Sequence, residues 1–206
     1  MEKKKSSRDR ILETAERLFI EQGVENTTVR EIAREAGTNL ALLNYYFKSK
    51  ENLFDEIFNN LLEKYTPSLP IILNAELPIN KKIEDYVSKY VDLLINNPKL
   101  VTLILSVLRH SPEKMANLEP TNNLYVSESF QEQLIQEAEN GTIVPTHPEH
   151  FFINMISMIA FPFTIKHLIM LKNELDEKGF TDFMQDHKKS VSNTLIASLS
   201  PSANDH

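Results

Sequence analysis

Residues 38–50, TNLALLNYYFKSK, combine side chains that need burial with side chains that need polar partners. Leu43 and Phe47 are one helical turn apart, and if both face inward, the polar groups occupy the N-terminal and outward faces of a short helix. These groups belong to Asn39, Asn44, Tyr45 and Tyr46. Asparagine can pair bidentately with adenine, and a tyrosine hydroxyl can donate to a phosphate oxygen. A helix that enters a DNA groove would have this pattern.

Two neighbouring residues extend this chemistry. Ala41 is small enough for close approach to the DNA backbone or to a thymine methyl group. Lys50 lies at the start of the next expected helix, where free backbone N–H groups and an ammonium group together can bind an anion. The alternative is a short packed helix in which Tyr45 and Tyr46 are half-buried and the lysines are solvated. This segment alone does not separate the two interpretations.

A second group of residues with chemical potential is the stretch from His147 to His150, HPEH, which offers two imidazoles and a carboxylate. Two histidines three positions apart across a proline are typical of a surface or a helix cap, and no distant third metal ligand is specified. The chain also has no cysteine and no phosphate-binding glycine loop. We therefore expect no catalytic residue, no metal and no cofactor, and interpret the protein as a non-enzyme.

The elements that position these residues are all helical, because apolar residues recur at spacings of three and four and period-two alternation is nearly absent. The expected helices cover about residues 7–22, 28–36, 39–47, 49–65, 81–96, 100–108, 123–140, 148–178 and 181–199. The second and third are short and separated by a tight turn at Gly37, with the first packed across them. This is the helix-turn-helix arrangement, in which the later helix enters the major groove.

The charge of the chain is uneven, although the total is −7. Residues 1–50 contain ten Lys or Arg and eight Asp or Glu, which gives +2, and the remaining residues carry −9. Only the N-terminal quarter can approach a polyanion favourably. The absence of cysteine suits a reducing compartment, and we expect a cytoplasmic protein.

Residues 151–171 are apolar enough to raise the question of a membrane span. They include Asn154, Pro162, Lys166 and His167, and their uncharged run of 15 residues is shorter than the roughly 20 that a bilayer requires. We expect a buried helix and no membrane segment. Pro162 should kink this helix and leave one backbone carbonyl without its helical partner.

Three motifs in order resemble the DNA-binding domain of the tetracycline-repressor (TetR) family of bacterial transcription regulators. They are AERLF at residues 15–19 followed by Gly23, TTVREIAREAG at residues 27–37, and NYYFKSKENLF at residues 44–54. The resemblance covers about residues 8–56. It implies an all-α protein with a three-helix DNA-binding domain at residues 1–50, a connecting helix at about 49–65, and a helical effector-binding and dimerisation domain at residues 66–206.

The resemblance also implies which residues face DNA. They are Thr28, Asn39, Leu40, Ala41, Leu42, Asn44, Tyr45, Tyr46 and Lys50. Several depart from the commonest pattern of the family, which has serine at position 39, lysine at 40, glycine at 41, threonine at 42, tyrosine at 44 and histidine at 46. The operator sequence therefore cannot be transferred, and Leu40 and Leu42 either contact thymine methyls or pack.

For the second domain, the resemblance implies a small-molecule effector and a homodimer formed by the last two helices. Candidate effector contacts form a set rich in aromatic and Met side chains: Tyr86, Tyr90, Leu105, Arg109, Tyr125, Phe130, Met155, Met158, Phe161, Phe163 and His167. The alternative for these residues is ordinary core packing. Candidate dimer contacts, from the apolar period of the last helix, are Phe183, Met184, Val191, Leu195, Ile196 and Leu199.

We expect a regulator, in the first instance a repressor, that binds a pseudo-palindromic operator as a dimer. Effector binding would select a conformation that shifts the connecting helix and moves the two DNA-reading helices out of register. Activation instead of repression stays open. A different interpretation is a helical interaction module that has lost its DNA role, and alanine at Asn44 and Tyr45 separates the two.

Overall fold

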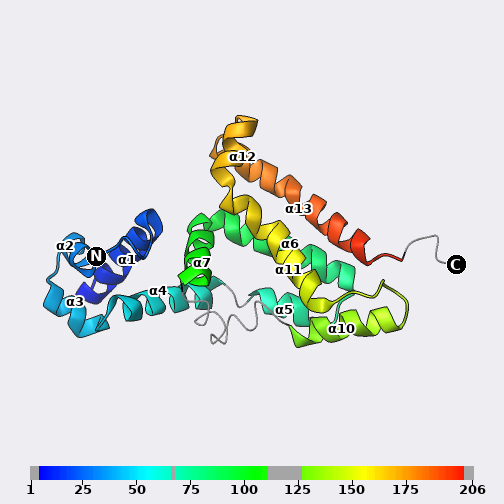
Figure 1. The fold of residues 1–206 in the computed structure, drawn as a ribbon, viewed down its shortest axis with the longest axis horizontal. Helices are drawn as coiled ribbons and strands as arrows, with labels where there is room; N and C mark the ends of the chain where they lie inside the picture. The colour runs from blue at the N-terminus through cyan, green and yellow to red at the C-terminus, as the bar shows by residue number, and fades with distance from the viewer. Residues whose placement is uncertain (1–4, 66–67, 111–126, 202–206) are drawn as a thin grey trace. The chain divides into compact units, whose positions relative to one another are not determined.

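The computed structural model describes residues 5–65, 68–110 and 127–201, and in these ranges it contains helices and no strand (Figure 1). The chain forms two compact units. The first comprises residues 1–64 and 102–112, and the second comprises residues 65–101 and 113–206. The all-α prediction is confirmed for the part of the chain that the structure describes.

The first unit begins with α1 (Ser7–Gln22), α2 (Val29–Glu35), α3 (Leu40–Phe47) and α4 (Lys50–Tyr65). Side chains that precede the first three helices cap their free N–H groups. Ser6 and Asp9 form a reciprocal capping box at α1, and Thr28 accepts from the Glu31 N–H at 3.2 Å at α2. These caps explain why helices α1 and α2 begin within one residue of the predicted positions.

The core of the first unit is a small apolar cluster in which α1, α2 and α3 pack against one another. The side chains of Ile11, Ile32, Leu43 and Leu53 have no exposed surface. Phe19 and Phe54 meet edge to face, with their ring centroids 5.7 Å apart. This core fixes the three short helices and leaves the outward face of α3 free.

The second unit contains α5 (Ser68–Asn74), α6 (Ile79–Asn96), α10 (Glu128–Glu139), α11 (Pro148–Thr164), α12 (Lys166–Asn173) and α13 (Glu177–Leu199). Helix α6 is central, because α5, α11 and α13 all pack against it. In Figure 1, α13 runs beside α6 and α11. Helix α7 (Pro98–His110) contributes residues to both units.

The helical run after residue 148 differs from the single helix expected over residues 148–178. It divides into α11 and α12, which are bent by 64° at Ile165, and α12 ends at Asn173. Helix α11 continues through Pro162, and the break lies three residues beyond it. No described helix is by itself long and apolar enough to cross a bilayer, although α11 and α12 taken together are.

Candidate functional site

The outward face of α3 presents polar and aromatic side chains to solvent. Leu43 is fully buried and Phe47 is 3% exposed, as the spacing predicted. On the opposite side, Tyr45 is 78% exposed and Tyr46 is 38% exposed, and their rings meet edge to face at 5.4 Å. Asn44 is also exposed. A stable helix therefore displays one amide and two hydroxyl groups that the core does not satisfy.

Two of the predicted DNA-facing residues also shape the helices on which they lie. The Oδ1 atom of Asn39 accepts a hydrogen bond from the Leu42 N–H at 2.8 Å, so Asn39 caps α3. Thr28 caps α2 in the same way. Both residues remain exposed, and the Asn39 amide nitrogen has no hydrogen bond among the described residues. Capping and contact with an external acceptor are therefore compatible at Asn39.

The remaining predicted contacts differ in accessibility. Ala41 is exposed, while Leu40, Leu42 and Lys50 are half-buried. The Lys50 ammonium group donates to the carbonyl oxygens of Val24 at 3.0 Å and Thr27 at 3.3 Å. In this structure Lys50 therefore holds the α1–α2 connection against the start of α4.

Cations of the first unit fall into two groups. Arg8 pairs with Glu56 and lies over the Phe47 ring at 5.4 Å, while Arg17 pairs with Glu21 and Glu35. By contrast, the exposed cations Arg30 on α2 and Lys48 after α3 have no hydrogen bond or ion pair within the described residues. Neither cation belongs to the predicted DNA-facing set, and the signal that could have identified them is their position beside Thr28 and Tyr46 in the sequence.

The fold and this face define a helix-turn-helix DNA-binding protein. The family model for bacterial regulatory proteins of the tetR family matches residues 11–57. YttP of Bacillus subtilis, a probable transcriptional regulator, is 27% identical over 164 residues, which is 78% of each chain. The repressor KstR2 of Mycolicibacterium smegmatis is 40% identical over 58 residues, or 28% of each chain. The chain belongs to the TetR family of transcriptional regulators.

A solved structure shows that the resemblance in fold extends beyond the matched segment. PfmR, a TetR-family regulator of Thermus thermophilus, superposes with a TM-score of 0.67 at 20% identity, covering 91% of this chain and 96% of PfmR. The curated relatives other than YttP match over about half of their length or less. The likeness in fold to PfmR therefore includes the second unit as well as the first.

The residues predicted to contact an effector are distributed over several places. Tyr86, Met155 and Phe130 are buried, as are Tyr90 and Phe163, whereas Met158 is half-buried. Three others are exposed, namely Leu105, Phe161 and His167. Leu105 lies in the part of α7 that belongs to the first unit. Tyr125 and the Arg109 side chain lie outside the described residues.

Tyr86 and Tyr90 are the pair that the structure brings together. They are one turn apart on α6, their rings meet edge to face at 5.8 Å, and Phe152 of α11 lies 6.3 Å from Tyr86. The Tyr86 hydroxyl is fully buried and has no hydrogen-bond partner among the described residues. Burial raises the pKa of Tyr90 to about 12 and that of Tyr86 well above its usual value.

The other buried aromatic residues of the effector prediction form separate pairs. The Phe130 ring lies 6.2 Å from Phe151, and the Phe163 ring lies 5.7 Å from Phe180. Such pairs are characteristic of a packed core. The helical spacing of apolar residues predicts which side chains are buried, but it does not predict which of them contact one another.

The residues predicted for the dimer interface include both buried and exposed side chains. Met184, Val191, Leu195 and Leu199 are at most 2% exposed inside one chain, so they have almost no surface left for a partner. Phe183 is 40% exposed and Ile196 is half-buried. Other exposed apolar side chains lie on α11 and α12, which pack against each other and against α13. They include Phe161, Leu168 and Leu171.

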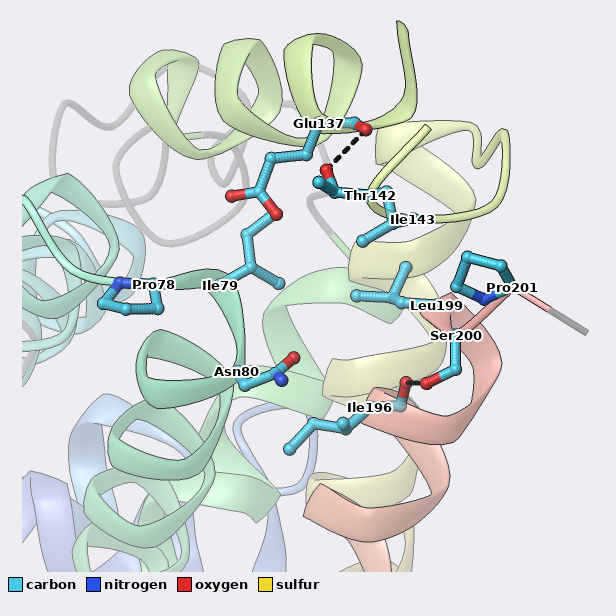
Figure 2. A pocket seen from close by; sticks show the side chains of 10 residues that line it. All are labelled: Pro78, Ile79, Asn80, Glu137, Thr142, Ile143, Ile196, Leu199, Ser200 and Pro201. Atoms are coloured by element: carbon cyan, nitrogen blue, oxygen red, sulfur yellow. Dashed lines mark hydrogen bonds between the residues drawn. The ribbon is translucent and has the colours of Figure 1, made fainter. Parts of the chain in front are cut away.

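A small cavity lies between the start of α6, the loop after α10 and the end of α13 (Figure 2). Ile196 and Leu199 line it from α13, and Glu137 extends into it from α10. The Val144 N–H donates to the Leu199 carbonyl at 2.9 Å, which ties the loop to the helix end. None of the predicted effector residues lines this cavity.

The histidine pair at the start of α11 remains a local feature. The rings of His147 and His150 stack with their centroids 4.5 Å apart. Within the described ranges, no group of three or more His, Cys, Asp or Glu side chains could hold a metal ion.

Proposed function

We propose that the protein represses transcription by binding, as a homodimer, to a pseudo-palindromic operator from which a small-molecule effector releases it. The observation that carries this proposal is the outward face of α3. Asn44, Tyr45 and Tyr46 are exposed there on a helix that Leu43 and Phe47 anchor. Repression is also what the name of the relative KstR2 states for that protein.

Base reading falls to the amide of Asn44, and positioning on the backbone falls to the tyrosine hydroxyls. An asparagine amide can pair with adenine N6 and N7, and one such pair discriminates by about 1–3 kcal/mol. Tyr45 and Tyr46 can donate to phosphate oxygens, and the unpaired cations Arg30 and Lys48 can neutralise phosphates. Each phosphate that a cation neutralises releases counterions, so affinity should fall as salt rises, and the acidic remainder of the chain should keep affinity for random DNA modest.

The dimer surface in this proposal comprises Phe161 of α11, Leu168 and Leu171 of α12, and Phe183 of α13. Leu171 is 79% exposed and Phe161 is 58% exposed. Large exposed apolar side chains on helices that pack together are typical of protein–protein contacts when they form one patch. This surface replaces the buried members of the sequence-based set, because those side chains are already packed within one chain.

The effector in this proposal reaches the Tyr86 and Tyr90 pair. A buried hydroxyl without a partner costs free energy until a polar group meets it, so a ligand with a hydrogen-bonding group gains affinity from Tyr86. Tyr86 and Tyr90 are on α6, which packs against α11 and α13. A ligand that separates them can therefore bias the conformation of the helices that carry the proposed dimer surface.

The test begins with selection of bound duplexes from a random pool and with gel shift on the DNA upstream of the protein's own gene. We expect a two-fold sequence with half-sites about 34–36 Å apart. A ligand screen for release of that duplex then tests the effector. Failure of the protein to retain any duplex at low ionic strength would overturn DNA binding. If affinity for the selected duplex is the same with and without every ligand, release by an effector is overturned, while DNA binding stands.

A further inference from the structure

Lys82 is a buried lysine whose ammonium group has no polar partner among the residues that the structure describes. The residue is 2% exposed and lies on the buried stripe of α6. Its Nζ atom lies 6.0 Å from the centroid of the Phe130 ring, and it makes no hydrogen bond or ion pair within the described residues. A buried charge without hydrogen bonds is costly, so the structure leaves a place for an acceptor at this position.

Lys82 also lines an open groove in the second unit. One wall is the connection between α5 and α6, including Asn74 and Glu76, and the other is α10, including Glu132, Gln133 and Glu137. Most of these side chains are polar, and α10 contributes both amide and carboxylate groups. A ligand in the groove would meet hydrogen-bonding groups on both walls.

The carboxylates of the groove differ in how far they are already engaged. Glu137 accepts from Gln133 Nε2 at 2.9 Å, and its side chain reaches from α10 toward the start of α6 (Figure 2). Glu76 and Glu132 are exposed and have no hydrogen bond or ion pair in the described part of the chain. Among the described lining residues, negative charge is therefore concentrated on exposed side chains, while the cation Lys82 is buried.

This arrangement discriminates among ligands by charge. A simple anion would gain Lys82 but would also face three carboxylates, and a simple cation would be repelled by Lys82. A molecule with a carboxylate at one end and an ammonium group at the other satisfies both sides. The carboxylate would accept from Lys82, and the ammonium group would lie among Glu76 and Glu132.

We propose that the groove between the α5–α6 connection and α10 binds a small zwitterion, such as an amino acid, with its carboxylate on Lys82. This site is distinct from the Tyr86 and Tyr90 pair and does not depend on the proposed repressor function. Neither the operator nor an effector response is needed to test it.

The experiment is calorimetric titration of the full-length protein with glycine, β-alanine, γ-aminobutyrate and L-lysine at fixed ionic strength. Acetate and ethylamine serve as single-charge controls. We expect at least one zwitterion to bind tenfold or more tightly than both controls. Lys82→Met keeps an apolar stem of similar length, and it should weaken that zwitterion at least tenfold, as loss of a charge-assisted hydrogen bond does.

The matched control is Lys81→Met, because Lys81 is exposed, pairs with Asp85 at 2.6 Å and does not line the groove. It should leave the dissociation constant unchanged. If Lys82→Met does not fold, the side-chain amide NMR signals of Gln133 and Gln136 in the unmodified protein should still shift on titration. Absence of binding by all four zwitterions, acetate binding as tight as theirs, or unaltered binding by the Lys82 variant would overturn the proposal.

Discussion

The Nε2 atom of His187 on α13 lies 3.1 Å from the backbone carbonyl oxygen of Met158 on α11. This carbonyl is the one that Pro162 leaves without a helical partner, because proline at position i has no N–H for the carbonyl at i−4. A carbonyl only accepts, so Nε2 carries the proton in this contact. The imidazole thus satisfies the backbone group that the proline exposes and joins α13 to α11 there.

The first prediction concerns this bond. His187→Ala should lower the free energy of unfolding by about 1 kcal/mol, because the Met158 carbonyl loses its donor. In a Pro162→Ala background the alanine N–H can bond this carbonyl, so the His187 substitution should cost less. Urea denaturation of the unmodified protein, the two single variants and the double variant measures the coupling free energy between His187 and Pro162. Equal cost in both backgrounds contradicts the assignment, and His167→Ala, an exposed histidine, is the control.

The second prediction concerns the two buried tyrosines at alkaline pH. Their folded-state pKa values are raised above the usual value of about 10, that of Tyr90 to about 12, so the folded state keeps protons that the unfolded state releases. Stability is therefore unaffected by them below pH about 10 and falls as pH rises from there toward about 12. Tyr90→Phe should flatten this decline in urea denaturation, and an unchanged pH profile would contradict it.

A third prediction follows from the isolated charge of Lys82. Burial lowers the pKa of its ammonium group, while Glu137 opposes this weakly. The unfolded state then binds the proton more tightly, so stability should rise with pH between the lowered pKa and about 10.5. Lys82→Met should raise the melting temperature at pH 7, and this gain should shrink toward pH 10.5.

The control for that comparison is Lys81→Met. The pKa of Lys81 is raised by its hydrogen bond with Asp85, and the pair is exposed, so its loss should change the melting temperature little. A Lys82 variant less stable than the unmodified protein at every pH would show that the charge has an unrecognised stabilising partner.

The fourth prediction separates two roles of Lys50. Its hydrogen bonds to Val24 and Thr27 predict that Lys50→Met lowers the free energy of unfolding by about 1 kcal/mol while leaving the salt dependence of DNA binding unchanged. If Lys50 instead leaves these carbonyls for a phosphate, the slope of log affinity against log salt falls by about 0.9. Lys48→Met, which removes an exposed unpaired cation, should show that fall.

Much of the first unit could be predicted because its signals are local. The spacing of Leu43 and Phe47 fixed the buried side of α3, and Ser6 and Thr28 marked helix starts through caps that involve residues three positions away. The capping role of Asn39 has the same local signal. What could not be predicted was the partner of Lys50, since its bonds join residues more than 20 positions apart.

In the second unit the apolar period located buried stripes but not their partners. Met184 and Leu195 were expected at a dimer surface, yet they pack within the chain, because α6 and α11 cover the side of α13 on which they lie. Lys82 was detectable, since it lies three positions after Ile79 and four before Tyr86 on the same stripe. The bond of His187 to Met158 required the fold itself.

The most direct test of the account measures DNA affinity by fluorescence anisotropy on the duplex selected from the random pool. Asn44→Ala and Tyr45→Ala should each weaken binding at least tenfold without changing the melting temperature, because both side chains are exposed on α3. Asn60→Ala, at an exposed position of α4, should bind like the unmodified protein. Unchanged affinity of both α3 variants would contradict the claim that this helix reads DNA.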